Sequence, residues 1–214
     1  MQVAHQTEGE PVAEIAQPTG WNEARQASPP IWGVDHLAFV TDDLVGTIEF
    51  YTRVLGLPLV HVRRVPFERD RGQPPYDNLR HYFFDMGNDS LLAFFEYPKG
   101  LARQERDRPG GMQHLALHVP RARFDEMIAH IRSCGIEVIG PVPLGGRFLS
   151  AYFYDNNGIR LELATSLADP ELGVVGSVLQ TEDEARAELA TLFDNPALVD
   201  KYLKRMRLSS VATR

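Results

Sequence analysis

Two histidines occupy the same place in two similar stretches of the sequence. The segment VDHLAFV at residues 34–40 is repeated as MQHLALH at residues 112–118, so His36 and His114 stand at matching positions. If the two units pack about a pseudo-twofold axis, matching residues come together. Neutral imidazole is the commonest metal ligand among side chains. The repeat therefore predicts two imidazoles at one site.

A carboxylate near the end of the second unit completes a ligand set. Glu162 lies in the apolar run at residues 159–164, and a buried carboxylate is costly unless it is paired or bound to a cation. The alternative is that Glu162 points to solvent. Together with His36 and His114 it makes two imidazoles and one carboxylate, the set that holds Fe(II) with open positions. Fe(II) is the first expectation for the metal, with Mn(II), Zn(II) and Ni(II) as alternatives. The single cysteine, Cys134, excludes a multi-thiolate structural zinc site.

The residues after each histidine predict the elements that position it. Apolar residues at intervals of three and four predict one amphipathic helix per copy, with Leu44, Ile48, Tyr51 and Leu55 in the first and Phe124, Ile128 and Ile131 in the second. Gly56 and Gly135 stand where helices commonly end in a left-handed residue. Strand-like runs follow at residues 79–86, 91–97, 148–154 and 159–164. Each copy is therefore predicted to be a β-α-β-β-β module of an α+β fold.

The flanks of the repeat differ in composition from the repeat itself. We expect a flexible N-terminal arm at residues 1–30, modules at 31–97 and 112–166, and a Pro- and Gly-rich linker at 98–111. Residues 167–214 are expected to form a helical C-terminal extension. In that extension, Thr181 with Glu184 has the form of a capping box, and Asn195-Pro196 has the form of a helix start.

Charge and hydropathy exclude several classes of protein. The 22 Lys and Arg against 29 Asp and Glu give a net charge of −7, which argues against nucleic acid as a partner. The apolar runs are too short to span a bilayer, and the first 30 residues do not have the pattern of a secretory signal. With one cysteine, the chain is expected in the cytoplasm.

The chain resembles the vicinal oxygen chelate superfamily in three features. These are the two modules, His36 and His114 near the module starts, and the closing segment YFYDNNGIRLE at residues 152–162. This superfamily includes glyoxalase I, extradiol dioxygenases, fosfomycin-resistance thiol transferases and bleomycin-binding proteins. The resemblance covers about residues 33–165. It implies that the paired modules form a curved mixed sheet around a metal site. It also implies that His36, His114 and Glu162 are the metal ligands, and that the substrate chelates the metal through neighbouring oxygens. Because the chain holds both modules, one chain is expected to complete the site, and a homodimer is an alternative.

The last strand of the first module decides the number of ligands. Glyoxalase-type members have a fourth ligand there, and in LLAFFEY at residues 91–97 its register falls on Phe94 or on Glu96. Phe94 leaves three protein ligands, and Glu96 supplies a fourth. We expect three, with Glu96 at the rim of the site.

Further residues are candidates for catalysis and for the substrate pocket. Tyr152 resembles the tyrosine of the extradiol signature, but the histidine that precedes it there is absent. His81 is the expected substitute, and His118 is the alternative. Arg64, in a Pro- and Arg-rich insertion at residues 63–76, and Arg147 are expected to meet the substrate.

These features favour an extradiol-type dioxygenase acting on a catechol-like small molecule. A glyoxalase-like lyase or isomerase, with Glu96 as ligand and proton shuttle, is the second hypothesis. The third is a metal-free protein that binds a small molecule of the antibiotic type, a class that lacks the metal ligands.

Overall fold

The computed structural model describes residues 31, 33–64, 79–103, 105–168 and 170–209. It contains two β-α-β-β-β modules, as the repeat predicts. The first comprises β1 (His36–Thr41), α2 (Leu44–Glu49) with the π-helical turn η1 (Phe50–Val54), β2 (Leu59–Arg64), β3 (Arg80–Asp85) and β4 (Leu91–Glu96). The second comprises β5 (Leu115–His118), α3 (Arg121–Ser133), β6 (Ile139–Leu144), β7 (Phe148–Tyr154) and β8 (Arg160–Ser166). The predicted α+β class is confirmed.

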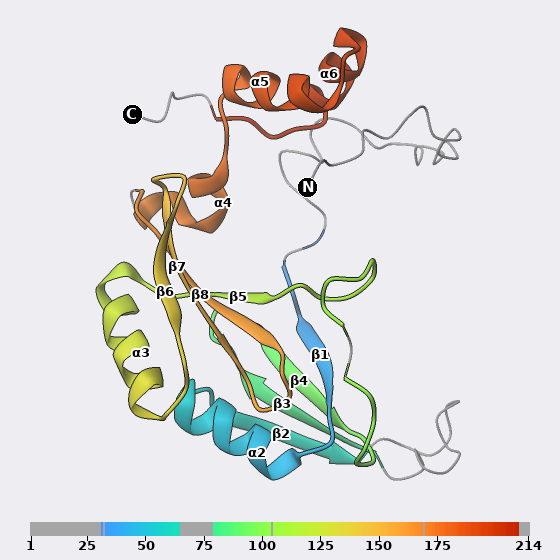
Figure 1. Ribbon diagram of the computed structural model, residues 1–214, viewed down its shortest axis with the longest axis vertical. Coiled ribbons are helices and arrows are strands. Elements are labelled where there is room, and N and C mark those ends of the chain that lie inside the picture. The colour runs from blue at the N-terminus through green and yellow to red at the C-terminus, as the bar shows by residue number, and fades with distance from the viewer. Residues whose placement is uncertain (1–30, 32, 65–78, 104, 169, 210–214) are drawn as a thin grey trace. The chain divides into compact units, whose positions relative to one another are not determined.

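Each module forms its own four-stranded mixed sheet (Figure 1). The strand orders are β1-β4-β3-β2 and β5-β8-β7-β6, so the two sheets have the same topology. The first strand of each module pairs in parallel with the last, and the other pairs are antiparallel. Parallel pairing of first and last strands requires the crossover that the helix supplies. The strand that begins at His36, and the strand that begins directly after His114, therefore each lie beside the closing strand of their own module.

Both helices end where the glycines predict. Gly56 (φ 71°) follows η1, and Gly135 (φ 81°) follows α3, a backbone conformation that costs glycine nothing because it lacks a Cβ. Asp43 caps the start of α2, and its side chain accepts a hydrogen bond from the backbone of Gly46. These ends fix the length of each helix against its sheet.

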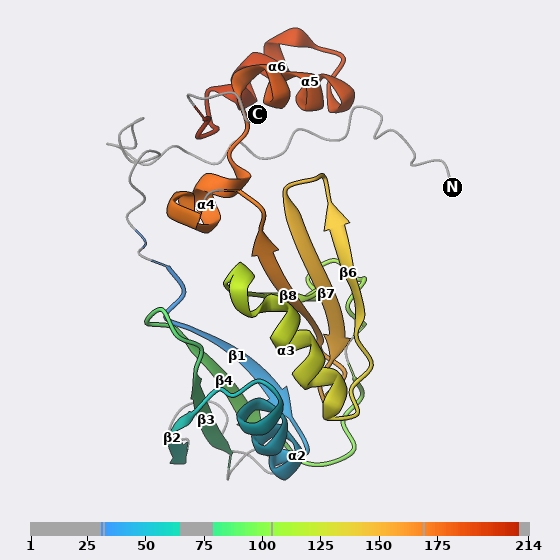
Figure 2. The same cartoon turned by 90° about the vertical axis from the view of Figure 1, so that its left-hand side faces the viewer.

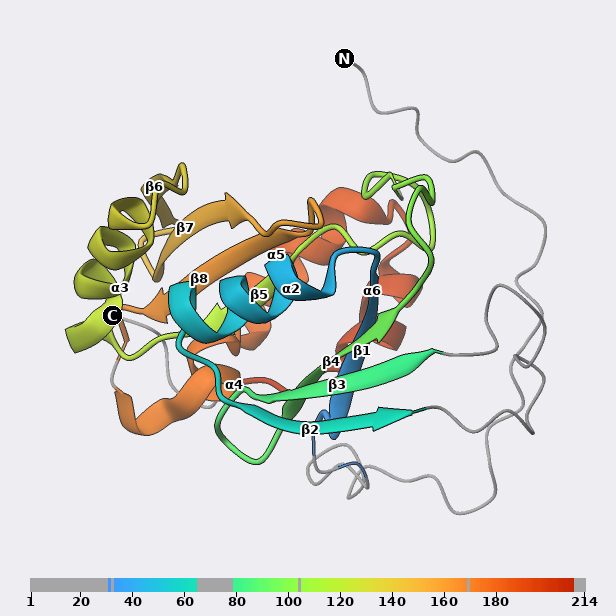
Figure 3. The same ribbon diagram turned by 90° about the horizontal axis from the view of Figure 1, so that it is seen from below.

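One hydrophobic core joins the two modules on the helix side of both sheets. Figures 2 and 3 show α2 beside the first sheet and α3 beside the second. The buried cluster includes Tyr51 from η1, Phe94 from the first sheet, and Phe124 and Phe153 from the second module. Phe50 and Phe153 stack across the modules, with ring centroids 6.5 Å apart. We call the other side of each sheet its open face.

A polar network also links the modules. The Tyr51 hydroxyl donates to Asp155 Oδ2 at 3.0 Å, and the Thr41 hydroxyl donates to Asn157 Oδ1 at 2.7 Å. Asn157 Nδ2 in turn donates to Thr47 Oγ1 at 3.1 Å. Asp155 and Asn157 belong to the turn between β7 and β8, so this turn of the second module is held by β1, α2 and η1 of the first.

The C-terminal residues form further helices. The compact unit that contains both modules extends from Gly33 to Leu179 and includes α4 (Gly173–Val178), and a second unit begins at Gln180. In the second unit, Thr181 and Glu184 form the predicted capping box at the start of α5 (Glu182–Leu192). Asn195 caps α6 (Pro196–Leu203), which has its proline in the first turn. In the described part of the chain, no helix is long and apolar enough to cross a membrane. The predicted N-terminal arm at residues 1–30 lies outside the described residues.

Candidate metal centre

His114 and Glu162 lie together on the open face of the second sheet. His114 Nε2 is 2.8 Å from Glu162 Oε2. His114 precedes β5, and in the parallel pairing of β5 with β8 it is Ala116, two residues later, that lies opposite Glu162. Glu162 is 6% exposed, which excludes the alternative that it points to solvent. A carboxylate this deeply buried requires the partner that the sequence predicts.

Gln113 determines which nitrogen of His114 faces Glu162. Its carbonyl oxygen Oε1 is in hydrogen-bond contact with His114 Nδ1, so Nδ1 carries a proton and Nε2 is the nitrogen that faces the carboxylate. A ring nitrogen and a carboxylate oxygen lie this close when a cation, either a proton on Nε2 or a metal ion, lies between them. The chemistry and orientation of these donors therefore fit a divalent metal ion.

Three neighbours surround the pair on the same face. The Ser150 hydroxyl donates to Glu162 Oε1 at 2.5 Å. Tyr152 lies opposite Glu162 across β7 and β8, and its ring meets the His114 ring edge to face, with centroids 6.1 Å apart. The Arg160 guanidinium lies over the Tyr152 ring, 4.3 Å from its centroid. Tyr152 thus lies beside His114 and Glu162, and its catalytic role stays a prediction.

His36 occupies the equivalent place on the open face of the first sheet. Its Nδ1 is 2.6 Å from Asp35 Oδ1, as His114 Nδ1 contacts Gln113, so Nε2 is the nitrogen left to ligate. Its ring meets Phe83 edge to face at 5.8 Å, and His81 lies 6.1 Å away between ring centroids. The first sheet therefore brings together two of the predicted site residues, His36 and His81.

The structure does not bring His36 to His114 and Glu162 within one chain. Among the described residues, which include all three, no group of three or more His, Cys, Asp or Glu side chains is close enough to hold a metal ion. The expectation that one chain completes the site is therefore not met. The physical reason is that the modules pack through their helix sides, and the ligands lie on the open faces.

The register of β4 corrects both candidates for the fourth ligand. Ala38 lies opposite Ala93 across β1 and β4, as Ala116 lies opposite Glu162, so Ala93 is the residue that matches Glu162 and it has no ligating atom. Phe94 is fully buried in the core. Glu96 lies on the same side as Phe94, where it accepts a hydrogen bond from the Tyr82 hydroxyl at 2.9 Å.

Arg80 also contacts Glu96, with Nη1 3.3 Å from Oε2. Burial, together with the hydrogen bond to Glu96, raises the pKa of Tyr82 to about 12. Glu96 is thus engaged on the side of the sheet away from His36, and its expected place at the rim of the site is wrong.

The two arginines proposed for the pocket lie elsewhere. Arg64 pairs with Arg80 at the end of β2 and shares the side of Tyr82, whereas Arg63 pairs with His81 on the open face. Arg147 is in the turn before β7, about 16 Å along the strand from Tyr152 at 3.3 Å per residue. The rest of the insertion, at residues 65–78, lies outside the described residues.

The sequence interpretation also missed residues that the structure places at the site. Arg160 and Ser150 alternate in phase with Glu162 and Tyr152, and this period-2 pattern is the signal that could have identified them. Asp35 and Gln113 immediately precede the histidines in the two copies of the repeat, which marks them as candidates to orient the rings.

Comparisons with known proteins agree with this fold. The family model described as Glyoxalase/Bleomycin resistance protein/Dioxygenase superfamily matches residues 33–163. The uncharacterised protein YwkD of Bacillus subtilis is 25% identical over 132 residues, which are 61% of this chain and 94% of YwkD. The lactoylglutathione lyase GLX1 of Arabidopsis thaliana is 28% identical over 139 residues, which are 64% of this chain and 45% of the lyase. The chain therefore matches less than half of that lyase.

A solved structure is similar to the same region. The glyoxylase/bleomycin resistance protein/dioxygenase domain from Frankia sp. EAN1pec is 19% identical, with a TM-score of 0.53 over 64% of this chain and 98% of that one. This similarity supports the fold alone. Because the family model matches more than half of the 214 residues, this chain belongs to the glyoxalase/bleomycin resistance protein/dioxygenase superfamily.

Proposed function

We propose that the protein is a mononuclear divalent-metal enzyme whose centre combines His114 and Glu162 of one chain with His36 of a second copy. The substrate is a small molecule that chelates the metal through two neighbouring oxygens. The observation that carries this proposal is the His114–Glu162 pair, because an imidazole nitrogen and a carboxylate oxygen, both metal ligands by type, face each other at 2.8 Å. His36 supplies the second imidazole of a two-histidine, one-carboxylate set.

Exposed apolar side chains on the open faces support a second copy. Val40 on the first sheet is 43% exposed, and Ile139 and Tyr154 on the second are 54% and 43% exposed. Apolar groups gathered on one face of a sheet favour contact with another surface. A twofold dimer that apposes the first open face of each chain to the second open face of the other covers both and creates two identical centres.

Three protein ligands leave open positions on the metal, two for oxygens of the substrate and one for a further small molecule. With Ala93 at the fourth position, the set matches that of Fe(II) oxygenases. When bound, such a metal activates dioxygen and the chelating substrate. The reaction we propose is therefore oxygen-dependent ring cleavage of a catechol-like aromatic.

Two of the chain's own residues are placed to act on the substrate. In the dimer, Tyr152 flanks the His114–Glu162 pair of its own chain. The second copy supplies both His36 and His81, which lie side by side in that chain. We assign Tyr152 to donate a hydrogen bond to a substrate oxygen. We assign His81 to take the proton from a catechol hydroxyl and to return it during cleavage.

A glyoxalase-like lyase or isomerase is the second candidate, and the similarity to GLX1 favours it. In that reaction a ligand carboxylate moves a proton, the role that Glu96 was expected to fill. Glu96 bonds to Tyr82 on the side away from His36, so Glu162 would have to fill that role. A metal-free binding protein is disfavoured, because such a protein does not require Glu162 to be buried beside His114.

Oxygen consumption distinguishes the two reactions. We expect protein purified without air and loaded with Fe(II) to consume oxygen with at least one member of a catechol panel, and to yield a ring-opened product seen by absorbance. His81→Gln is expected to reduce turnover by about 100-fold, because proton transfer contributes that order of rate, and to retain the metal. If no catechol supports uptake, and the protein instead converts a hemithioacetal of methylglyoxal and a thiol, the lyase is correct.

A further inference from the structure

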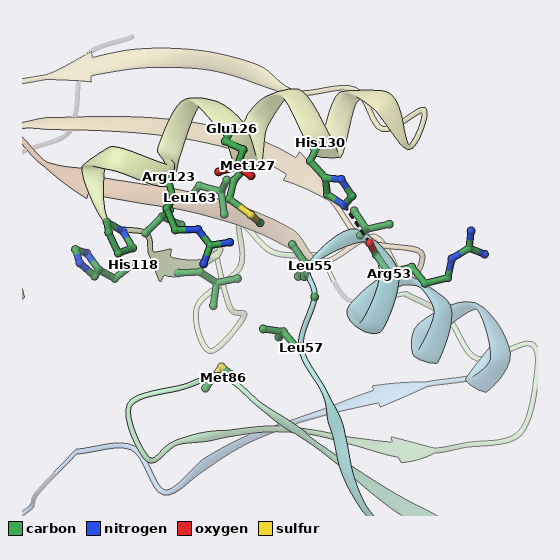
Figure 4. Close-up of a pocket in the computed structure, with 15 residues that line it drawn as sticks. Arg53, Leu55, Leu57, Met86, His118, Arg123, Glu126, Met127, His130 and Leu163 are labelled. Carbon is green, nitrogen blue, oxygen red and sulfur yellow. Dashed lines mark hydrogen bonds between the residues drawn. The ribbon is translucent and has the colours of Figure 1, made fainter.

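A cavity of about 580 Å³ lies at the junction of the two modules, and neither His36 nor the His114–Glu162 pair lines it. The first module contributes Leu55 and Leu57, after η1, and Met86, in the turn between β3 and β4. The second contributes Met127 on α3 and Leu163 on β8. Figure 4 shows the two methionine side chains reaching toward the space between the modules. Small-molecule sites commonly have this volume and an apolar lining, and methionine adapts to ligands of varied shape.

Arg123 provides a positive charge at this apolar cavity. Its guanidinium projects toward the space between α3 and Leu57 (Figure 4), and within the described residues it forms neither a side-chain hydrogen bond nor an ion pair. Arg53 is different, because it pairs with Glu49 and extends away from the cavity (Figure 4). Arg123 is thus a cation that a ligand can engage without first breaking an ion pair.

The other polar groups at the cavity do not cancel this charge. Pro120 is the N-cap of α3 and makes no side-chain cap bond, so the positive end of the helix dipole adjoins this wall. His118 also lines the cavity, and His130 bonds through Nε2 to the Arg53 carbonyl at 3.0 Å. Glu126, on the α3 turn that follows Arg123, is the one acid among the lining residues, and within the described residues it forms no ion pair with Arg123.

We propose that this cavity is a second binding site, for a small apolar acid whose carboxylate pairs with Arg123 and whose hydrocarbon body packs between Met86 and Met127. This site is independent of the metal and of the proposed reaction. Because its walls come from both modules, a bound acid holds their relative position and raises the stability of the folded chain by mass action.

Matched probes test the proposal in the full chain by calorimetry. We expect 2-naphthoate to bind about tenfold more tightly than the neutral 2-naphthylmethanol, the ratio that one charge-assisted contact of about 1.4 kcal/mol gives. Arg123→Gln should abolish the preference and retain binding of the alcohol. Met127→Trp should fill the cavity and abolish binding of both probes.

Arg121→Gln is the matched control. Arg121 lies on the same helix, pairs with Asp125 at 2.9 Å and does not line the cavity, so this variant should keep the tenfold preference. The proposal is wrong if the wild-type protein binds neither probe or binds both equally, or if Arg121→Gln loses the preference as Arg123→Gln does. Retained binding of both probes by folded Met127→Trp protein, with folding checked by circular dichroism, would place them elsewhere and also overturn it.

Discussion

Glu162→Gln is expected to lower metal affinity on the order of 100-fold, because it removes a charged ligand from the proposed centre of three protein ligands. The glutamine has the same shape, so the fold should remain intact. Its carbonyl can still accept the hydrogen bond from Ser150, which turns the amide N–H toward His114 Nε2. The variant thus replaces the Glu162 carboxylate with a neutral amide, and the N–H group of that amide occupies His114 Nε2, the nitrogen proposed to bind the metal. Metal per chain after dialysis, measured by mass spectrometry, checks this result.

Two control variants distinguish the proposed ligand Glu162 from residues that only orient it or lie elsewhere. Ser150→Ala removes only the hydrogen bond to Glu162 Oε1, and the affinity should fall about tenfold, as for other groups that orient ligands. Glu96→Gln should retain the metal, because Glu96 bonds to Tyr82 and Arg80 on the other side of the sheet. Loss of metal in Glu96→Gln, with Glu162→Gln fully loaded, would reverse the ligand assignment.

Asp155→Ala is expected to lower the free energy of unfolding by about 3 kcal/mol. The Asp155 carboxylate accepts hydrogen bonds from the backbone N–H groups of Asn157 and Ile159 at 2.8 and 2.7 Å, and from the Tyr51 hydroxyl and Asn157 Nδ2 at 3.0 and 3.1 Å. Alanine leaves these donors without their acceptor. Tyr51→Phe keeps the ring in the core and removes one bond, so it should cost about 1 kcal/mol. Urea unfolding measures both values.

The pH dependence gives a second readout of the same group. Burial raises the pKa of Asp155 above its usual value of 3.8, although its hydrogen bonds oppose the shift. The folded state therefore binds the proton more tightly than the unfolded state, and the contribution of Asp155 to stability falls as the pH rises from 3.8 through the raised pKa. The difference in unfolding free energy between wild type and Asp155→Asn should thus be larger at pH 4 than at pH 7. A difference that is constant or grows with pH would contradict the raised pKa.

The sequence predicts the fold well because the repeat marks both where each module starts and where each helix ends. The matching histidines define the module starts, and Gly56 and Gly135 mark where the helices end. Glu162 is identified because a carboxylate in an apolar strand requires a partner, and the structure supplies His114. These predictions depend on spacing along one strand or one helix, which sequence periodicity records directly.

The register between strands is harder to predict. Phe94 and Glu96 do lie on one side of β4, as the alternation predicts, but which side depends on the pairing of β4 with β1. A shift of one residue exchanges the two sides, and the observed pairing puts Ala93 at the position that matches Glu162.

The sequence pattern also does not determine how the two repeats pack against each other. Internal symmetry requires that His36 and His114 occupy equivalent places, and they do, each with an aromatic ring at its edge. Symmetry does not determine whether the open faces meet within one chain or between two. Here the helix sides fill the core within the chain, and the open faces lie outside that core.

We propose that His36 acts in the metal centre of another chain, and a heterodimer of two variants that each lack one ligand distinguishes this shared centre from a centre completed within one chain. His36→Ala and Glu162→Gln, co-expressed with different tags and purified through both, pair a chain that lacks one ligand with a chain that lacks the other. In a dimer with shared centres, one centre loses both ligands and the other is intact, so the heterodimer should bind about half the wild-type metal. Each variant alone should bind almost none. A heterodimer that binds no more metal than the separate variants would contradict the shared centre.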